Sequence, residues 1–263
     1  MNRLVAEHGI FRKWVRTISD WVDLQWSVLV ESLKQVAPRA RGRLLDVGCG
    51  NKPYEEYFRP YVSEYLGIEH EATFETTSAG NSARRPDMLY DGVKLPFPDR
   101  SFDTVLNVQV LEHTPYPGRL VCEMSRVLRD DGLLILVAPF QFRLHEQPHD
   151  YFRYSSHGLR HLCEEAGMEV LEIHPQGGMW TVIGHKVNSY LAFRIARIGS
   201  RAQAMGKLGH ERKVEENMRV WTLPFVGVSM VSVALAARLF DRLLVEPDEM
   251  MNFMILAQRK RNR

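Results

Sequence analysis

The stretch LLDVGCGNKPY, residues 44–54, decides the fold, because two apolar residues lead into an acidic residue and then into a run with little side-chain bulk. Asp46 falls at the end of a short apolar segment that is typical of a buried strand. Gly48 and Gly50 follow, and glycine lets a ligand approach the backbone closely. In open parallel sheets, ligands bind beyond the carboxyl ends of the strands. The stretch therefore predicts a ligand site at the end of a first strand.

The spacing of the glycines indicates which kind of ligand this turn suits. A dinucleotide-binding turn has the pattern G-x-G-x-x-G, whereas Pro53 replaces the third glycine here. Asp46 would repel a pyrophosphate, but it could hold a cationic group. The turn favours a positively charged amino-acid moiety over a nicotinamide dinucleotide. A tight strand-to-helix turn without a ligand is the alternative interpretation.

The rest of the chain alternates short apolar runs with amphipathic segments, which predicts a parallel sheet with helices on both faces. The segments 116–132 and 155–167 are the expected helices, and each closes on a glycine. The expected strands are RLLDVG (43–48), EYLGIE (64–69), DMLY (87–90), FDTVLNV (102–108), GLLILVAP (132–139), MEVLEIHP (168–175) and MMNFMILAQRK (250–260).

Further motifs complete a recognisable pattern. GIEH (67–70) ends the second strand on Glu69, which can accept two hydroxyl hydrogens of a ribose. YDGVKLPFPDRSFDTVLNVQVLEH (90–113) and MSRVLRDDGLLILVAPF (124–140) follow. With these motifs, roughly residues 40–174 resemble the class I S-adenosylmethionine-dependent methyltransferases, in their type 11-like branch. The resemblance runs through Asp46, Gly48, Gly50, Glu69, Asp91, Leu95, Pro96, Phe97, Ser101, Phe102, Asp103, Val110, Leu111, Glu112 and His113.

The resemblance implies an α/β fold: a Rossmann-like, doubly wound seven-stranded sheet whose last strand is antiparallel. It also implies S-adenosyl-L-methionine as cofactor. Lys52 stands where this family often has a further glycine. The implied cofactor contacts are Asp46 and the backbone of Gly48, Cys49 and Gly50 to the methionine part, Glu69 to the ribose, Asp91 and Gly92 to the adenine edge, and Asn107 and Gln109 beside the sulfonium.

The segment after the fifth strand, FQFRLHEQPHDYFRYSSHGL (140–159), concentrates candidate catalytic groups. His145 or His149 is the first choice as a proton acceptor, with Asp150 raising its basicity. The alternative is a structural clamp in which Arg153 pairs with Asp150. His113 is a further candidate base, or a positioned structural histidine. No spacing in the sequence predicts a metal site. The segment resembles an H-x-x-P-x-D-Y-x-R-Y stretch of methyltransferases encoded near sugar and cell-envelope biosynthesis functions.

About 70 residues separate the last two strands, and they include 18 uncharged residues from Val220 to Ala237. By length this stretch is a candidate membrane span. A single crossing would leave the last strand across the bilayer from its sheet, and Lys186, Arg194 and Arg197 interrupt the other apolar stretch. The remaining alternatives are a buried lid, a homodimer face, or a segment that lies on a membrane surface.

Composition indicates which partners and which cellular compartment to expect. The chain has 34 basic and 32 acidic residues, a formal net charge of +2, so no global field favours nucleic acid. Three cysteines without a C-x-x-C pair fit a reducing compartment. We expect a cytoplasmic protein, at the inner membrane face if it is peripheral. The expected parts are an N-terminal helical cover (1–40), the cofactor-binding core (41–179), a helical insertion or lid (180–247), and the last strand with a basic tail (248–263).

The sequence thus predicts a methyltransferase that O-methylates a sugar, a glycan or a lipid-linked small molecule. The first alternative is a carbon or oxygen methyltransferase acting on a quinone-like lipid. The second is a catalytically silent partner subunit with the same fold. Retention of Asp46, Gly48, Gly50, Glu69 and Asp91 together argues against a silent partner.

Overall fold

The computed structural model describes residues 19–72, 74, 85–92, 94–192, 223–246 and 248–261. The chain divides into two compact units. The sheet unit comprises residues 32–176 and 252–263, and the helical unit comprises residues 1–31 and 177–251. The helical unit thus combines the N-terminal segment with the insertion before the last strand. Residues 1–18 and 193–222 of the expected cover and insertion lie outside the described residues.

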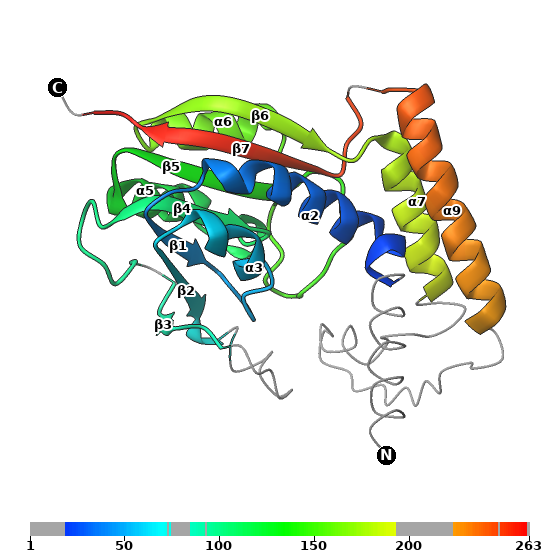
Figure 1. Ribbon diagram of the computed structural model, residues 1–263, viewed down its shortest axis with the longest axis horizontal. Helices are drawn as coiled ribbons and strands as arrows, with labels where there is room; N and C mark the ends of the chain where they lie inside the picture. The colour runs from blue at the N-terminus through cyan, green and yellow to red at the C-terminus, as the bar shows by residue number, and fades with distance from the viewer. Residues whose placement is uncertain are drawn as a thin grey trace, which may run out of the picture. The chain divides into compact units, whose positions relative to one another are not determined.

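The sheet unit contains one seven-stranded sheet with the order β3-β2-β1-β4-β5-β7-β6 (Figure 1). Neighbouring strands from β3 to β5 are parallel, whereas β7 is antiparallel to both β5 and β6. The prediction of a Rossmann-like sheet with an antiparallel last strand is confirmed. The strands are β1 (Arg43–Val47), β2 (Glu64–His70), β3 (Met88–Tyr90), β4 (Phe102–Val108), β5 (Leu128–Pro139), β6 (Met168–Gln176) and β7 (Asn252–Arg259).

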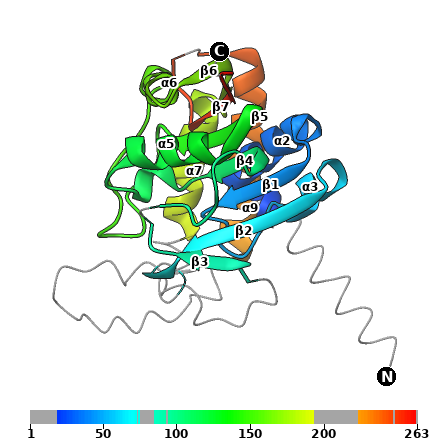
Figure 2. The same ribbon diagram turned by 90° about the vertical axis from the view of Figure 1, so that its left-hand side faces the viewer.

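Helices cover both faces of this sheet, with α5 and α6 on one face and α3 on the other (Figure 2). α6 ends just before Gly167, which has a φ of +75°, as its sequence predicts. The expectation that the preceding helix closes on Gly132 is wrong, since β5 already begins at Leu128. The helices and 3-10 turns of this unit are η1 (Ala37–Arg39), α3 (Glu55–Phe58), η2 (Arg59–Tyr61), η3 (Leu111–His113), α5 (Pro117–Val127) and α6 (Ser156–Glu165); α2 (Leu24–Val36) begins in the helical unit and ends in the sheet unit.

The central strands form the core of the sheet unit. Residues 134–138 of β5 have no exposed surface, because strands covered by helices on both faces bury consecutive side chains. Each fully buried leucine or isoleucine contributes about 1.5–3 kcal/mol through apolar burial. This rigid core fixes the carboxyl ends of β1, β2, β4 and β5 along one edge, where the loops carry the functional candidates.

The helical unit is built on α7 (Met179–Tyr190) and α9 (Leu223–Leu243). Gly184 of α7 allows close packing, because a Cβ there would lie 2.8 Å from Leu24 Cδ1 and 2.9 Å from Ala237 Cβ. The carboxylate of Asp241 accepts hydrogen bonds from the backbone N–H groups of Gly178, Trp180 and Thr181. A side chain of α9 therefore caps the amino end of α7, where unpaired N–H groups favour an anion.

Arg238 also belongs to the internal packing of this unit. Its guanidinium donates to the Trp21 carbonyl oxygen and to Ser27 Oγ, and it lies 4.1 Å from the centre of the Trp21 ring. Burial lowers the pKa of Arg238. The sequence places this arginine beside an apolar stretch, where it could bind lipid head groups, but the structure assigns it to contacts within the protein.

The outer face of α9 carries large apolar side chains, and Phe225 is 76% exposed. Among the described residues, Pro224–Leu243 is the one helix long and apolar enough, by length and composition alone, to cross a membrane. Only 17% of that window is buried within the structure, so this part of the insertion is not a buried core helix. The exposed apolar residues of the outer face are Phe225, Val228, Leu235, Leu239 and Leu243.

Candidate active site

The turn after β1 is shaped by two glycines with different surroundings. Gly48 has a φ of +76°, and a Cβ there would lie 2.3 Å from Val110 Cγ2. A side chain at Gly48 would therefore meet Val110 first. Gly50 has a φ of +51°, and a Cβ there would meet nothing within 4 Å. The open space for a ligand lies beside Gly50.

Asp46 lies at the carboxyl end of β1 and is 1% exposed. Its carboxylate accepts a hydrogen bond from the hydroxyl of Tyr65. Burial raises the pKa of Asp46 to about 7, because a charged carboxylate loses its hydration there. A cationic ligand would restore the ionised form.

Glu69 lies at the carboxyl end of β2 and connects that strand to the glycine turn. Its carboxylate oxygens accept hydrogen bonds from the N–H of Gly50 at 2.7 Å and from the N–H of His70 at 2.8 Å. Burial raises the pKa of Glu69 despite these hydrogen bonds. Each oxygen keeps a further lone pair for a ligand hydroxyl, so Glu69 both orients the turn and remains able to bind.

Lys52, which replaces a glycine of the family pattern, has a structural partner that the sequence did not reveal. It has a φ of 53°, and its Nζ lies 2.5 Å from Asp87 Oδ2. Asp87 also accepts the N–H of Gly67 at 2.7 Å. Gly67 leaves room for this arrangement, because a Cβ there would lie 2.9 Å from Lys52 Cε. The lysine thus ties the turn to the strands beside it.

The ends of β3 and β4 carry the remaining predicted cofactor residues. Asp91 Oδ1 accepts the N–H of Lys94 at 3.3 Å, and Gly92 has a φ of +76° beside the His70 ring. Asn107 donates to the carbonyl oxygen of Val47 at 3.0 Å.

Gln109 extends the polar edge at the end of β4. It has a φ of 56° and donates through Nε2 to Asn252 Oδ1 at 3.2 Å. Asn107 Oδ1 and Gln109 Oε1 are buried and have no hydrogen-bond partner among the residues the structure describes. Two buried acceptors at this edge are therefore available to a donor on a ligand.

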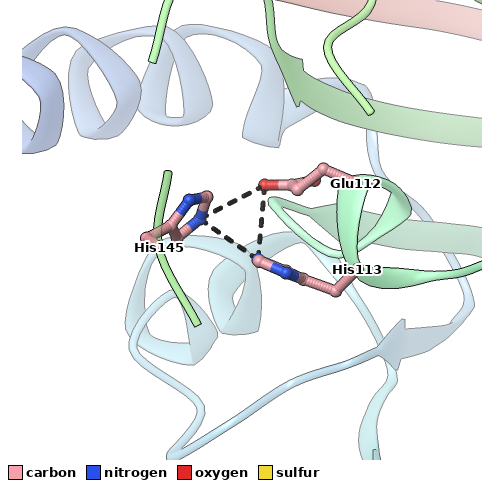
Figure 3. A group of neighbouring side chains, drawn as sticks. All are labelled: Glu112, His113 and His145. Carbon is pink, nitrogen blue, oxygen red and sulfur yellow. Dashed lines mark hydrogen bonds and ion pairs between the residues drawn. The ribbon is translucent and has the colours of Figure 1, made fainter. Parts of the chain in front are cut away.

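The loops after β4 and β5 bring Glu112, His113 and His145 together (Figure 3). Adjacent parallel strands end at the same edge, which explains why these separated segments meet. His113 Nε2 lies 3.1 Å from His145 Nε2. Burial lowers the pKa of His145, and it raises the pKa of Glu112 to about 8. Glu112 stood in the sequence motif but was not among the predicted site residues.

The segment 140–154 contains the clamp that the sequence offered as an alternative. Arg153 donates to both carboxylate oxygens of Asp150, at 2.6 and 2.8 Å. Although burial opposes it, the hydrogen bonds from Arg153 and from the N–H of His145 lower the pKa of Asp150 to about 2. His149 is exposed, and its Nδ1 lies 3.1 Å from the hydroxyl of Tyr151. Of the predicted bases, the structure therefore groups His113 with His145 and separates the His149 side chain from them.

Tyr54, the aromatic residue that closes the opening motif, is close enough to Asp46, at the end of β1, and to Glu112, after β4, for both carboxylates to affect its pKa. The carboxylates of Asp46 and Glu112 both disfavour its phenolate, and burial, the larger cause, raises the pKa of Tyr54 in the same direction. Both carboxylates are thus within electrostatic range of one side chain.

Comparison with known protein families matches residues 45–136 to the family described as "Methyltransferase domain". Residues 45–136 are a methyltransferase domain of the class I S-adenosylmethionine-dependent family. The cofactor of this domain is S-adenosyl-L-methionine. The matched range contains Asp46, the glycine turn, Glu69, Glu112 and His113. His145, in the loop after β5, lies outside this range.

Curated relatives support the same assignment. A protein of Mycobacterium tuberculosis named "Probable S-adenosylmethionine-dependent methyltransferase" is 32% identical over 107 residues, which are 40% of this chain and 39% of that protein. A relative of the same description in Mycolicibacterium smegmatis is 31% identical over 147 residues, 52% of this chain and 56% of that protein. The chain thus spans between about two fifths and somewhat more than half of the length of these relatives.

Solved structures with low sequence identity share the fold. A methyltransferase of Archaeoglobus fulgidus matches with a TM-score of 0.52 and 14% identity, over 89% of this chain and 94% of that chain. The cyclase SpnF matches with a TM-score of 0.51 and 18% identity, over 89% of this chain and 80% of that chain. One of these two proteins is a cyclase, so the fold alone does not identify a reaction.

The residues of this edge fit S-adenosyl-L-methionine. The space beside Gly50 would admit a ligand against the backbone, and the buried Asp46 would be ionised by a cationic amino group. The unpaired oxygens of Asn107 and Gln109 could accept hydrogen bonds from it. Glu69 retains lone pairs for ribose hydroxyls.

Proposed function

We propose that this protein methylates a hydroxyl oxygen of a sugar, a glycan or a lipid-linked small molecule, using S-adenosyl-L-methionine. Use of this cofactor is supported by the pair of buried carboxylates, Asp46 and Glu69, which flank the Gly50 turn at the ends of β1 and β2. A hydroxyl acceptor is supported by the cluster of Glu112, His113 and His145, which can promote loss of its proton. A catalytically silent partner is not favoured, because such a protein has no need to retain this costly pair of buried carboxyl groups.

The residues of the chain divide the work between binding and proton transfer. S-adenosyl-L-methionine, when bound, supplies a methyl group whose bond to sulfur breaks as its bond to the acceptor oxygen forms. Asp46 and Glu69 would orient the cofactor, and the reaction is accelerated chiefly by the alignment of the methyl donor with the acceptor. The acceptor hydroxyl must also lose its proton, and the cluster of Glu112, His113 and His145 is the part of the edge that can promote this loss.

The acceptor is tested by incubating the protein with methyl-labelled S-adenosyl-L-methionine and a panel of nucleotide sugars, lipid-linked sugars and quinone-like lipids. The proposal predicts label in a sugar or lipid-linked hydroxyl, and less label in the Glu69→Ala variant when the cofactor is not saturating. Label in a quinone-like lipid alone would instead support the alternative acceptor. Absence of transfer to all three classes, with the cofactor bound, would contradict the proposed acceptor chemistry.

We also propose that the outer face of α9 lies on a membrane surface at the cytoplasmic side. This face exposes Phe225, Leu235 and Leu239, and the segment before it, residues 194–219, contains seven basic and three acidic residues. Basic residues that adjoin an apolar helix in the sequence favour anionic lipid surfaces. β7 follows α9 and pairs with β5 and β6, which favours surface contact over a crossing. An acceptor with a lipid tail would suit this location.

Co-sedimentation with vesicles of phosphatidylcholine and phosphatidylglycerol tests the surface contact. The double variant Phe225→Asp, Leu239→Asp should lose binding, whereas His157→Asp adds a negative charge at an exposed position of α6 and should retain most of it. No vesicle binding by the wild type, with a dimer in light scattering, would support a homodimer face instead. Protease protection of the C-terminal tail in sealed vesicles would indicate a crossing.

A further inference from the structure

Two histidine nitrogens and one carboxylate oxygen point toward a common centre in Figure 3. His113 Nδ1 lies 2.6 Å from the carbonyl oxygen of His149, which can only accept, so this nitrogen carries the hydrogen. His145 Nδ1 also faces acceptors, the carbonyl oxygen of Arg143 at 3.3 Å and Asp150 Oδ2 at 3.4 Å. In their neutral forms, both rings therefore carry the hydrogen on Nδ1 and leave Nε2 with a free lone pair.

With Glu112 ionised, the groups at this centre are all acceptors. The two Nε2 atoms lie 3.1 Å apart, and neutral rings with this arrangement have no hydrogen to share between them. Glu112 is fully buried, and neither of its carboxylate oxygens has a hydrogen-bond partner among the described residues. A buried carboxylate without a partner is costly. A cation at the centre would compensate all three groups at once.

The distances between these atoms fit a metal ion. Glu112 Oε1 lies 3.8 Å from His113 Nε2 and 4.0 Å from His145 Nε2. A triangle with sides of 3.1, 3.8 and 4.0 Å has a circumradius of about 2.1 Å, so one point lies about 2.1 Å from all three atoms. Bonds from Zn²⁺ to imidazole nitrogen and to carboxylate oxygen have lengths of about 2.0–2.2 Å. The three atoms are therefore close enough to one another to be ligands of one ion, and small side-chain adjustments would give a tetrahedral geometry.

We propose that Glu112, His113 and His145 bind one divalent transition-metal ion, for which Zn²⁺ is the best match. Two imidazoles and one carboxylate form a known catalytic zinc set with a coordination position left open. The hydrogen bonds at both Nδ1 atoms match the outer contacts that orient metal-binding histidines. Glu146 Oε2 lies 3.8 Å from His113 Nε2, so a further carboxylate stands beside the centre.

The role of this ion rests on the proposed function. An acceptor hydroxyl bound at the open position would have a lowered pKa, as metal-bound water does. Its proton could then be lost to water near neutral pH. Glu112, His113 and His145 would promote the proton loss through the metal, and neither histidine would itself be the base.

Metal content tests the site without any acceptor. The protein is stripped with a chelator, dialysed against Zn²⁺ alone, and assayed for bound metal by mass spectrometry; Co²⁺ replacement gives a visible absorption band that reports nitrogen ligation. We expect one equivalent in the wild type. Glu112→Gln and His145→Gln should each weaken binding by about 100-fold or more, since outer contacts alone are worth 10- to 100-fold. His149→Ala should retain the metal, because only its backbone carbonyl contacts the cluster.

Circular dichroism of each variant shows whether the fold is retained. Absence of stoichiometric Zn²⁺ and Co²⁺ binding by the wild type would overturn the proposal, and would indicate that a proton occupies the centre. Retained binding in folded Glu112→Gln and His145→Gln variants would overturn it as well. Calorimetry with S-adenosyl-L-methionine on the same samples separates this result from a failure of the proposed function, since the cofactor contacts lie at β1 and β2.

Discussion

The two halves of the sheet edge differ in how their buried polar groups are satisfied. At the ends of β1 and β2, Asp46 accepts from Tyr65, and Glu69 accepts from the N–H groups of Gly50 and His70. At the ends of β4 and β5, the buried carboxylate of Glu112 has no hydrogen-bond partner among the described residues. The first half is already ordered by the chain itself, whereas the second half is completed only by a bound cation or ligand.

The two halves of the edge therefore differ in how strongly ligand binding affects the stability of the protein. Internal hydrogen bonds hold the cofactor half in one geometry before any ligand binds, which lowers the ordering cost of binding. The unpaired acceptors of the other half cost free energy in the empty protein. That cost is recovered when a ligand arrives, so stability and function are coupled more strongly at β4 and β5 than at β1 and β2.

Substitution at the seam between the two halves should have the largest effect. In Gly48→Ala the new Cβ would lie 2.3 Å from Val110 at a φ of +76°. We expect the free energy of unfolding to fall by about 2–5 kcal/mol, the sum of left-handed backbone strain and overpacking. Urea unfolding measures it.

Gly167→Ala is the matched control for this substitution. Its φ is +75°, but a Cβ there meets nothing within 4 Å, so only the strain of about 1–2 kcal/mol remains. Equal losses in the two variants would show that the closeness of Val110 to position 48 adds no penalty beyond the backbone strain.

Removing the carboxylate of the cofactor half should weaken ligand binding without unfolding the protein. Glu69→Ala should lower the affinity for S-adenosyl-L-methionine by about 1.5–3 kcal/mol, roughly 10- to 100-fold, the range for hydrogen bonds to a charged group. Calorimetry measures the change. Glu64→Ala, at the opposite end of β2, removes an exposed pair with Arg43 and should leave the affinity unchanged; similar losses in both variants would refute a direct role for Glu69.

The raised pKa of Asp46, about 7, predicts a smaller, pH-dependent effect. The folded pKa lies above the ordinary value of 3.8, so the stability that the protonated carboxyl contributes is lost as pH rises from about 4 through 7. Cofactor binding needs the ionised form, so its affinity should rise with pH, by at most about tenfold per unit below pH 7. Calorimetry between about pH 5.5 and 7.5 should show the affinity rising with pH in the wild type and staying constant in Asp46→Asn. A flat wild-type response would show that no proton leaves Asp46 on binding.

Much of the cofactor half could be predicted from the sequence, because its residues form contiguous motifs at strand ends. Asp46, the glycine turn and Glu69 each follow a run of apolar residues, so the position of the strand fixes the position of the side chain. The pairing of Lys52 with Asp87 escaped prediction, since it depends on which strands become neighbours.

The half of the edge at the ends of β4 and β5 could be predicted only in part. His113 and His145 were candidates, but their meeting with Glu112 depends on β4 and β5 being adjacent and on the path of the loop after β5. Spacing along the chain carries no signal for such a cluster. The internal role of Arg238 was hidden for the same reason, because its partners Trp21 and Ser27 lie in a distant part of the sequence.

Cofactor binding beside Gly50 is tested by calorimetric titration of S-adenosyl-L-methionine into Gly50→Ala, with the wild type and Gly167→Ala as controls. Both alanines bear similar left-handed strain, of about 1–2 kcal/mol, and neither Cβ meets the protein within 4 Å. The account predicts one cofactor per chain in the wild type and in Gly167→Ala, and severe loss of binding in a folded Gly50→Ala. Full affinity in Gly50→Ala, or no binding by the wild type, would contradict the assignment of this edge to the cofactor.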